Sequence, residues 1–525
     1  MNAVQLLGDE MFGWSDLDGT RGPGPVRGPG LAALLPVVSG RTLVVGPHDL
    51  DLLDALPSAD LTVLVRGLPD AEALAARYAH RSGVRVCCGG PEKLAGTSPY
   101  DSIVALAGLD RLASAEGTQL SWGEAFDLLV SVLRPGGRLL LSAENPSGLH
   151  RLLASPLPRA DSDWAALGEY DDTRPAGPAR LQARLTASGL RIDGAWAVFP
   201  SHLAPTALIG VELLADPALT GFLQAALSDQ SVLDGGGGGT RGPAAEGHGP
   251  VPAAPMLADP ARLVGSAVRN GIAVELAPAW VLLGERPPDL ESGSDPTHRV
   301  WTEQAGAVPA AILGQHGRLR QVRRDPAGGW RFDDGAAVPS GRTVEDLVVA
   351  ASLRRDLPAV RALLTTWQSG AVAGVPADAV VVTPDGTWHG LTEGTEPVLR
   401  RLASRLIDVG LADLWPAGEL TTMLTAMAGR EPGPAVDDGG AAVEGWRELL
   451  TDRERLAREL AEARALRDWY EGALTERDDE LRRLRGIVSL LHGKPTVRAG
   501  RLLLAGARTA RRTVRSAVRR LRPTN

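Results

Sequence analysis

The chain has 525 residues and a mass of 55.0 kDa, which suggests three or four structural units at roughly 150 residues per domain. Hydrophobic residues make up 44% of the sequence and charged residues 22%, so a packed core is possible and disorder of the whole chain is excluded. The formal net charge is −8, but residues 486–525 contain ten basic and no acidic side chains, which leaves −18 on the rest. An acidic body repels polyanions, so we do not expect a nucleic-acid partner.

The cysteines and the N-terminal segment bear on the cellular compartment. Cys87 and Cys88 are adjacent, so a bond between them closes no loop, and two cysteines are too few for a zinc site. The N-terminal segment carries Asp9, Glu10 and Asp16 and lacks a basic stretch before a hydrophobic core, so no secretory leader is expected. No apolar run approaches the length of about 18 residues that spans a bilayer. These features predict a cytoplasmic protein.

The first part of the chain alternates short β-rich apolar runs with helical segments. Strands are predicted at residues 42–46, 61–65, 84–88, 100–106 and 138–142, and helices at 69–81 and 121–134. This alternation predicts βαβ units and a doubly wound, Rossmann-like α/β fold whose parallel sheet is covered on both faces. A helix at 178–190 and strands at 195–199 and 273–283 complete a first domain over residues 1–290.

A flexible insertion interrupts this first domain. Asp234 is followed by five glycines, and the Gly/Pro-rich composition continues to about Pro255. We therefore predict a flexible insertion over residues 228–256.

Residues 296–432 are predicted to form a small α+β domain of unknown role. The range 311–324 has the pattern of a hairpin, and so does 378–390. Thr343 and Asp346 are spaced as a capping box that opens a helix. The order of these elements is faintly similar to that of kinase-like phosphotransferases. Their catalytic acid has no counterpart here, so we prefer a role in substrate positioning or oligomerisation.

The sequence becomes charged and helical from about Glu444. Two series of positions with heptad spacing begin at Leu449 and Arg453, and ten of their thirteen residues are apolar. This pattern predicts a coiled coil over residues 442–492 that makes a homo-oligomer, a dimer or trimer. The alternative is a single helix that packs back onto its own chain.

The last segment, residues 493–525, is predicted to be a basic amphipathic tail. Such a segment lies on an anionic membrane, binds a polyanion, or remains a solvated end. The last aromatic residues are Trp469 and Tyr470, so stacking on nucleic-acid bases is unsupported. We favour the membrane surface or an envelope-assembly partner, which would place the protein at the inner membrane face.

Two motifs give the first domain a family resemblance. Residues 133–137, with the sequence LRPGG, supply a tight turn between a helix and a strand. Together with Tyr100-Asp101-Ser102-Ile103-Val104, this segment resembles strands four and five of class I S-adenosylmethionine-dependent methyltransferases over residues 40–285. Residues 144–150 resemble the segment after strand five in a subgroup that acts on sugars or envelope glycans. The resemblance implies methyl transfer from S-adenosylmethionine to an oxygen or nitrogen of a sugar or envelope-glycan precursor.

The resemblance also implies where the cofactor binds. Ligands of such sheets lie outside the carboxyl ends of the strands, so the loops after the first four strands matter most. The matching positions are Gly46, Pro47, His48, Asp49, Arg66, Gly90, Glu92 and Ala107. Val44 and Arg66 stand where the family usually has acidic residues, and an arginine accepts no hydrogen bonds from ribose hydroxyls.

The sequence offers one candidate catalytic residue, His150, and leaves open a second interpretation in which the protein is not an enzyme. A histidine whose pKa is near neutrality suits a base that deprotonates a sugar hydroxyl, although a surface histidine is the common alternative. The sequence shows no nucleophile elbow, P-loop or metal-ligand spacing, so no metal is predicted. The rival interpretation is a non-catalytic scaffold that assembles partners through the coiled coil. The position of the Arg66 side chain discriminates between the two.

Overall fold

In the computed structural model, the residues described fall into several ranges. These are 4–19, 23–94, 98–153 without 115 and 119, 171–228, 259–288, and 308–431 without 316–317, 393, 395–396, 412–413 and 415–419, with scattered positions between 455 and 488. The chain divides into two compact units, Met1–Pro432 and Gly433–Asn525, which are described separately. None of the helices in the described ranges is long and apolar enough to cross a membrane.

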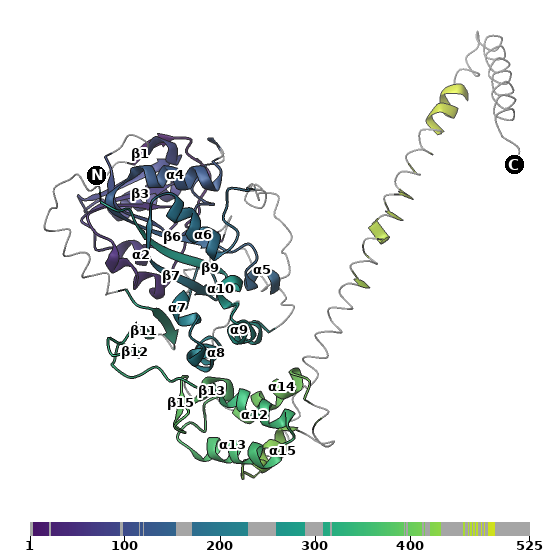
Figure 1. Ribbon diagram of the computed structural model, residues 1–525. Helices are drawn as coiled ribbons and strands as arrows, with labels where there is room; N and C mark the ends of the chain where they lie inside the picture. The colour runs from purple at the N-terminus through teal and green to yellow at the C-terminus, as the bar shows by residue number, and fades with distance from the viewer. Residues whose placement is uncertain are drawn as a thin grey trace, which may run out of the picture. The chain divides into compact units, whose positions relative to one another are not determined.

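A twelve-stranded sheet dominates the first unit (Figure 1). Its parallel part has the order β1-β4-β3-β2-β5-β6, with the bounds β1 Gln5–Gly8, β2 Arg41–Val45, β3 Asp60–Val65, β4 Val84–Gly89, β5 Tyr100–Ala105 and β6 Leu133–Glu144. The order reverses between β2 and β5, as in doubly wound sheets, and this switch point is where such sheets bind ligands. The doubly wound prediction is confirmed, and the arrangement fits a Rossmann-like methyltransferase sheet.

The other half of the sheet is antiparallel. It has the order β9-β7-β8-β10-β11-β12, with the bounds β7 Arg191–Phe199, β8 Ala207–Gly210, β9 Ala279–Glu285, β10 Ala311–Gln315, β11 Arg318–Arg324 and β12 Trp330–Phe332. The predicted hairpin at 311–324 is present as β10 and β11. Ala311 of β10 pairs with Ile209 of β8, so the hairpin extends the large sheet, whereas the sequence placed it in the small domain.

Helices cover both faces of the sheet (Figure 1). Their bounds are α1 Pro29–Ala32, α2 Leu50–Asp54, α3 Leu68–Arg77, α4 Trp122–Val132, α5 Leu149–Leu153, α6 Pro178–Ala187, α7 Val211–Leu214, α8 Thr220–Ser228, α9 Pro260–Arg269 and α10 Ala273–Leu276. Alternate side chains of a strand enter opposite cores: Leu43 and Val45 of β2 belong to one core and Val44 to the other. A continuous apolar run therefore forms a strand that is buried on both faces.

Helix α4 lies within the range predicted for it, 121–134, but ends two residues earlier, at Val132. The hydroxyl of Ser121 accepts a hydrogen bond from the backbone N–H of Glu124, whose carboxylate accepts one from the Ser121 N–H, which forms a complete capping box. β6 begins directly afterwards at Leu133, so the predicted turn at 133–137 lies inside the strand, where the pairing with β5 shifts register and Gly136 takes a positive φ of 76°.

A smaller core lies in the same compact unit as the large sheet. It consists of β13 Arg342–Thr343, β14 Val380–Val382, β15 Trp388–Gly390, α12 Val344–Leu353, α13 Leu357–Ser369, α14 Val398–Asp408 and α15 Leu420–Met427. The fully buried Trp367 lies in this core. Thr343 caps α12 by accepting a hydrogen bond from the Asp346 N–H, and β14 and β15 form the hairpin predicted at 378–390.

The second unit is described only at scattered positions between 455 and 488, all of which are helical. The apolar seam residues described there, including Leu456, Leu474 and Leu484, are exposed, so the coiled coil stays a prediction. The tail 493–525 and all of the predicted insertion except Ser228 lie outside the described residues.

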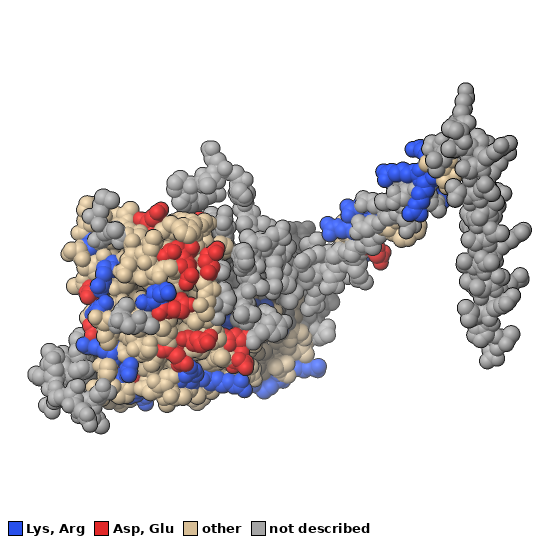
Figure 2. All heavy atoms as spheres, turned by 90° about the horizontal axis from the view of Figure 1, so that it is seen from above, with Lys and Arg blue, Asp and Glu red and all other residues tan. Residues whose placement is uncertain are grey.

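Figure 2 shows acidic and basic side chains interspersed on one face of the molecule.

Candidate functional site

A buried histidine fixes the conformation of the loop after β2. His48 is only 3% exposed, its Nδ1 donates to the Gly46 carbonyl oxygen at 3.1 Å, and its Nε2 accepts from the Leu106 N–H at 3.3 Å. Burial lowers the pKa of His48 to about 4, so the imidazole is neutral. His48 thus ties the loop after β2 to the loop after β5 at the switch point.

The neighbours of His48 in this loop have local roles. Gly46 has a φ of 84°, and a Cβ added to it would lie 3.3 Å from the Cβ of Ala107. The Pro47 carbonyl oxygen accepts from the Val26 N–H at 2.9 Å. The Asp49 carboxylate caps α2 by accepting from the Asp51 N–H at 3.0 Å. Among the predicted cofactor residues of this loop, the side chains of His48 and Asp49 therefore already form hydrogen bonds within the protein.

Arg66, at the end of β3, is paired with an acid from the N-terminal segment. Its Nε lies 2.7 Å from Oδ2 of Asp16, and its Nη2 lies 2.8 Å from Oδ1 of the same carboxylate. Asp16 is only 3% exposed, and the Arg66 side chain 15%. Sequence reasoning missed Asp16, because its partner is 50 residues away. The charge of Arg66 is thus neutralised by a carboxylate from another segment, both of whose oxygens bind the guanidinium.

The loop after β4 carries Gly90 and Glu92. The Gly90 N–H donates to the Gly8 carbonyl oxygen at 3.0 Å, so the N-terminal strand β1 borders this loop. Glu92 lies in the short 3₁₀ turn Pro91–Leu94, and its buried Oε2 has no hydrogen-bond partner among the described residues. An unpaired buried carboxylate oxygen carries a desolvation cost that a bound donor would remove.

The loop after β5 opens onto a cavity of about 160 Å³. It is lined by Pro23, Ala107, Gly108, Asp110, Arg111, Ser142, Glu144 and His202. Nη1 of Arg111 donates to the Gly24 carbonyl oxygen at 2.6 Å, whereas its buried Nη2 has no hydrogen-bond partner in the described part of the chain. Burial lowers the pKa of Arg111, and an arginine nevertheless stays charged at neutral pH. The cavity thus contains a fixed positive charge with an unused donor.

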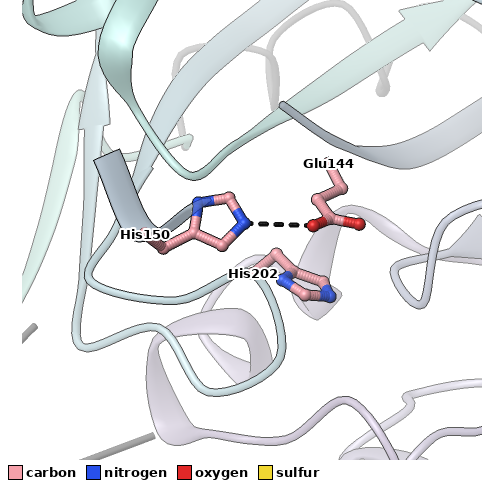
Figure 3. A group of neighbouring side chains, drawn as sticks. All are labelled: Glu144, His150 and His202. Atoms are coloured by element: carbon pink, nitrogen blue, oxygen red, sulfur yellow. Dashed lines mark hydrogen bonds and ion pairs between the residues drawn. The ribbon is translucent and has the colours of Figure 1, made fainter. Parts of the chain in front are cut away.

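Beside this cavity, Glu144 and His150, which are close in sequence, lie next to His202 from a later loop (Figure 3). His150 Nε2 lies 3.0 Å from Oε1 of Glu144, which also accepts from Arg151 Nε at 2.8 Å. The rings of His150 and His202 are 5.8 Å apart between centroids. Burial alone would raise the pKa of the Glu144 carboxyl, but the contacts with His150 and Arg151 lower it. Burial lowers the pKa of His202 to about 4.

The predicted base His150 is therefore adjacent to the cavity through Glu144, while His202 lines it directly. Sequence reasoning missed His202, Asp110, Arg111 and Ser142, because no local motif marks them. A partial signal existed for Asp110 and Arg111, since they follow the fourth predicted strand, where ligands of such sheets bind.

Comparisons with known proteins give structural neighbours only. No protein-family model matches this sequence, and no curated protein matches it. A chain in the complex of the Haloferax volcanii Trm112 methyltransferase activator with a methyltransferase is 14% identical, with a TM-score of 0.27, covering 49% of this chain and 87% of that one. The [4+2]-cyclase SpnF is 18% identical, with a TM-score of 0.25, covering 49% of this chain and 79% of that one.

A third neighbour was solved with a cofactor product. The N-methyltransferase NodS of Bradyrhizobium japonicum WM9, in complex with S-adenosyl-L-homocysteine, is 17% identical, with a TM-score of 0.23, covering 31% of this chain and 73% of that one. At such low TM-scores, the fold assignment rests on the strand order and pairing described above.

Proposed function

We propose that the chain transfers a methyl group from S-adenosylmethionine to an oxygen or nitrogen of a small polar acceptor. The observation that carries the proposal is a pair of buried polar atoms of opposite character without partners. One is the acceptor Oε2 of Glu92 after β4, and the other is the donor Nη2 of Arg111 after β5. Both loops lie at the carboxyl edge of the sheet, where doubly wound folds bind ligands.

The spacing of the strands suits an elongated ligand. Strands β4 and β5 are separated by β3 and β2, so three intervals of about 4.8 Å place their ends ~14 Å apart. The cofactor is a nucleoside that carries an amino-acid chain. Glu92 would accept from the adenine amine, and Arg111 would bind the amino-acid carboxylate. In the middle, Asp16 would supply the oxygens that Arg66 lacks for the ribose hydroxyls.

Catalysis would rest mainly on positioning. When bound, the cofactor supplies an electrophilic methyl group. The acceptor would bind in the cavity beside it, between Arg111 on one side and Glu144 and His202 on the other. The pKa of His202 is lowered to about 4, and that of Glu144 is also lowered, so neither is a strong base at neutral pH. Alignment of the acceptor with the methyl group is therefore the main contribution of these residues.

The acceptor class and the cellular site are also proposals. A sugar or envelope-glycan precursor is supported by the charged and hydroxyl side chains in the cavity wall, Arg111, Ser142 and Glu144, and by the likeness of residues 144–150 to a sugar-modifying subgroup. A place at an anionic membrane surface is supported by the excess of arginines in the tail 493–525.

The test is calorimetric titration of the full chain with S-adenosylmethionine and with its demethylated product. We expect micromolar binding of both, weakened at least tenfold by E92Q and by R111Q. E72Q is the matched control, because Glu72 is an exposed residue of α3. Absence of binding at millimolar ligand, with circular dichroism showing a folded protein, would overturn the proposal.

A non-catalytic scaffold is the second candidate, and His48 favours it. Its ring lies at the switch point and is hydrogen-bonded to the loops on both sides. A cofactor that needs this space must displace the ring, which costs two hydrogen bonds worth about 1 kcal/mol each. In the scaffold case, titration with S-adenosylmethionine shows no binding to the wild type or to H48A, because no ligand competes with the ring. If the enzyme proposal holds, H48A retains or improves cofactor binding.

A further inference from the structure

Glu144, His150 and His202 form a cluster with the composition of a metal site (Figure 3). Each offers one ligand atom, and these three atoms lie within 4.8 Å of one another. Glu144 ends β6, His150 belongs to α5, and His202 lies in the loop between β7 and β8. The cluster therefore joins three elements that are separate in the sequence.

The backbone around Glu144 is fixed by its neighbour. The Asn145 amide donates to the carbonyl oxygens of Glu275 and Ala277, at 2.7 and 2.8 Å, and its Oδ1 accepts from the Ser147 N–H at 3.0 Å. Asn145 is itself only 3% exposed. These bonds hold the turn between β6 and α5, so that His150 lies back against Glu144. Ligand positions are thus set by the fold before any ion arrives.

Two ring nitrogens in the cluster have no hydrogen-bond partner among the residues that the structure describes. They are Nδ1 of His150 and Nδ1 of His202, and both are buried. Buried polar atoms normally have partners, and a bound group would supply one to Nδ1 of His202, whereas Nδ1 of His150 lies on the side of its ring away from Glu144 (Figure 3). Neutral imidazole is the form that binds metals, and each of the two rings offers one nitrogen to the cluster.

We propose that Glu144, His150 and His202 bind a divalent transition-metal ion of the zinc class, with an open coordination position toward the cavity. Two imidazoles and one carboxylate are the donor set of catalytic zinc sites, in which a water or substrate takes the fourth position. Glu144 and His202 line the cavity of about 160 Å³, which leaves room for that fourth ligand. The proposal stands whether or not the chain binds S-adenosylmethionine.

The three ligand atoms must move slightly closer together to bind one zinc ion. Tetrahedral zinc with bonds of about 2.1 Å places its ligand atoms ~3.4 Å apart. The three atoms now lie within 4.8 Å, and the Glu144–His150 pair is already at 3.0 Å. Binding of one ion would therefore require the ring of His202 to move closer to the Glu144–His150 pair.

Arg151 is the strongest argument against an ion at this position. Its Nε lies 2.8 Å from the same Glu144 oxygen that faces His150, and its positive charge opposes a cation. The Arg151 side chain is 42% exposed, so it can turn toward water when an ion arrives. Without a metal, the same residues form only a hydrogen-bonded ion-pair network, and the experiment must separate these two cases.

The experiment uses the full chain after treatment with EDTA and dialysis. Zn²⁺ is titrated by calorimetry, Co²⁺ is followed by its visible absorption, and Mg²⁺ serves as the comparison ion. We expect micromolar binding of one Zn²⁺, a tetrahedral Co²⁺ spectrum, and no competition by Mg²⁺, which prefers oxygen ligands. E144Q and H202N should each weaken Zn²⁺ binding at least tenfold and abolish the Co²⁺ bands.

The controls separate this site from other histidines of the chain. H80A removes an exposed histidine of the first unit and should change neither signal. R151A removes the competing cation and should leave zinc binding intact or tighter. Zinc affinity that is equal in the wild type, E144Q and H202N would overturn the proposal. A wild-type protein without a tetrahedral Co²⁺ spectrum would overturn it too, even if a variant fails to fold.

Discussion

His48 shows how a residue picked for chemistry can instead serve stability. Sequence reasoning placed it in the loop after the first predicted strand, and it does lie there, after β2, whereas its role in cofactor binding stays a prediction. Whether a ring in this loop faces solvent or the interior depends on Leu106, which is 58 residues away and supplies the N–H that the ring accepts. No local pattern reveals such a partner. Asp16, the partner of Arg66, was hidden for the same reason.

Burial of His48 predicts acid sensitivity. Its pKa falls from 6.5 to about 4 in the folded state, so the unfolded chain binds more protons in this window. The free energy of unfolding therefore decreases as pH falls from about 6.5 to about 4, with a loss of about 3 kcal/mol from this group. Urea unfolding of H48Q should show a weaker pH dependence than the wild type over this window. H80A should keep the wild-type dependence, and identical curves for H48Q and wild type contradict the argument.

Glu345 has the opposite effect on stability. Burial, and then the nearby Asp378, raise its pKa from 4.5 to about 7, so the folded state favours the protonated carboxyl. The free energy of unfolding should therefore fall by about 2 to 3 kcal/mol as pH rises from about 4.5 to about 7.

The variant E345Q tests this, because glutamine resembles the protonated acid. We expect it to be more stable than the wild type at pH 8 and about equal at pH 4.5, measured by denaturant unfolding. Equal stability at pH 8 would mean that Arg405, which lowers this pKa, compensates the charge. E72Q, at an exposed position, is the control and should be neutral at both pH values.

At the level of elements, the parallel strands were the most predictable feature. Their apolar runs have no polar face, and only a strand covered on both sides suits such a run. The predicted strand at 273–283 was partly wrong, because Ala273–Leu276 forms α10 and β9 begins only at Ala279. Short apolar runs do not distinguish helix from strand, and Pro278 separates the two elements here.

The hairpin at 311–324 shows a second limit. Its strands were predicted from local pattern, but its pairing with β8 depends on an edge that is about 100 residues earlier in the chain. Edge strands offer unpaired N–H and C=O groups to any compatible strand. The sequence therefore predicts that a hairpin forms there, and tertiary packing decides which sheet it joins.

The capping box of α4 leads to a prediction about the stability that a helix cap contributes. Ser121 and Glu124 satisfy each other's backbone N–H groups at the start of the helix. Removal of the serine hydroxyl in S121A leaves the Glu124 N–H without that partner, which should lower the free energy of unfolding by about 1 kcal/mol. S121T should restore most of the loss, because threonine is also an effective cap. A change below about 0.3 kcal/mol in S121A would mean that water replaces the cap.

For the whole molecule, the candidate site shows what a sequence leaves open. Residues 144–150 are one motif, and their closeness was predictable. The cavity also needs Arg111 from the loop after β5 and His202 from the loop after β7. These loops meet only because the strand order places β5 beside β6 and β7 two strands further on. The order of strands in a sheet is a global property that hydrophobic periodicity does not encode.

The coiled coil carries the last prediction, at the level of assembly. In a single chain, the seam residues Leu456, Leu474 and Leu484 are 57%, 67% and 56% exposed. Burial of each leucine in a helix–helix interface contributes roughly 1.5 to 3 kcal/mol, so repeated heptads favour association. Sedimentation equilibrium of the full chain should give the mass of a dimer or trimer.

Charge placed in the seam tests whether that interface causes the association. The double variant L474E/L481E buries four or six carboxylates if the helices pair, and their desolvation and mutual repulsion should shift the protein to a monomer. The matched control is E462K, because Glu462 is exposed and lies outside the seam. It changes the charge of the helix but should leave the mass unchanged. A wild-type monomer at micromolar concentration would instead favour a helix that packs on its own chain. An oligomer that survives in L474E/L481E would place the interface elsewhere.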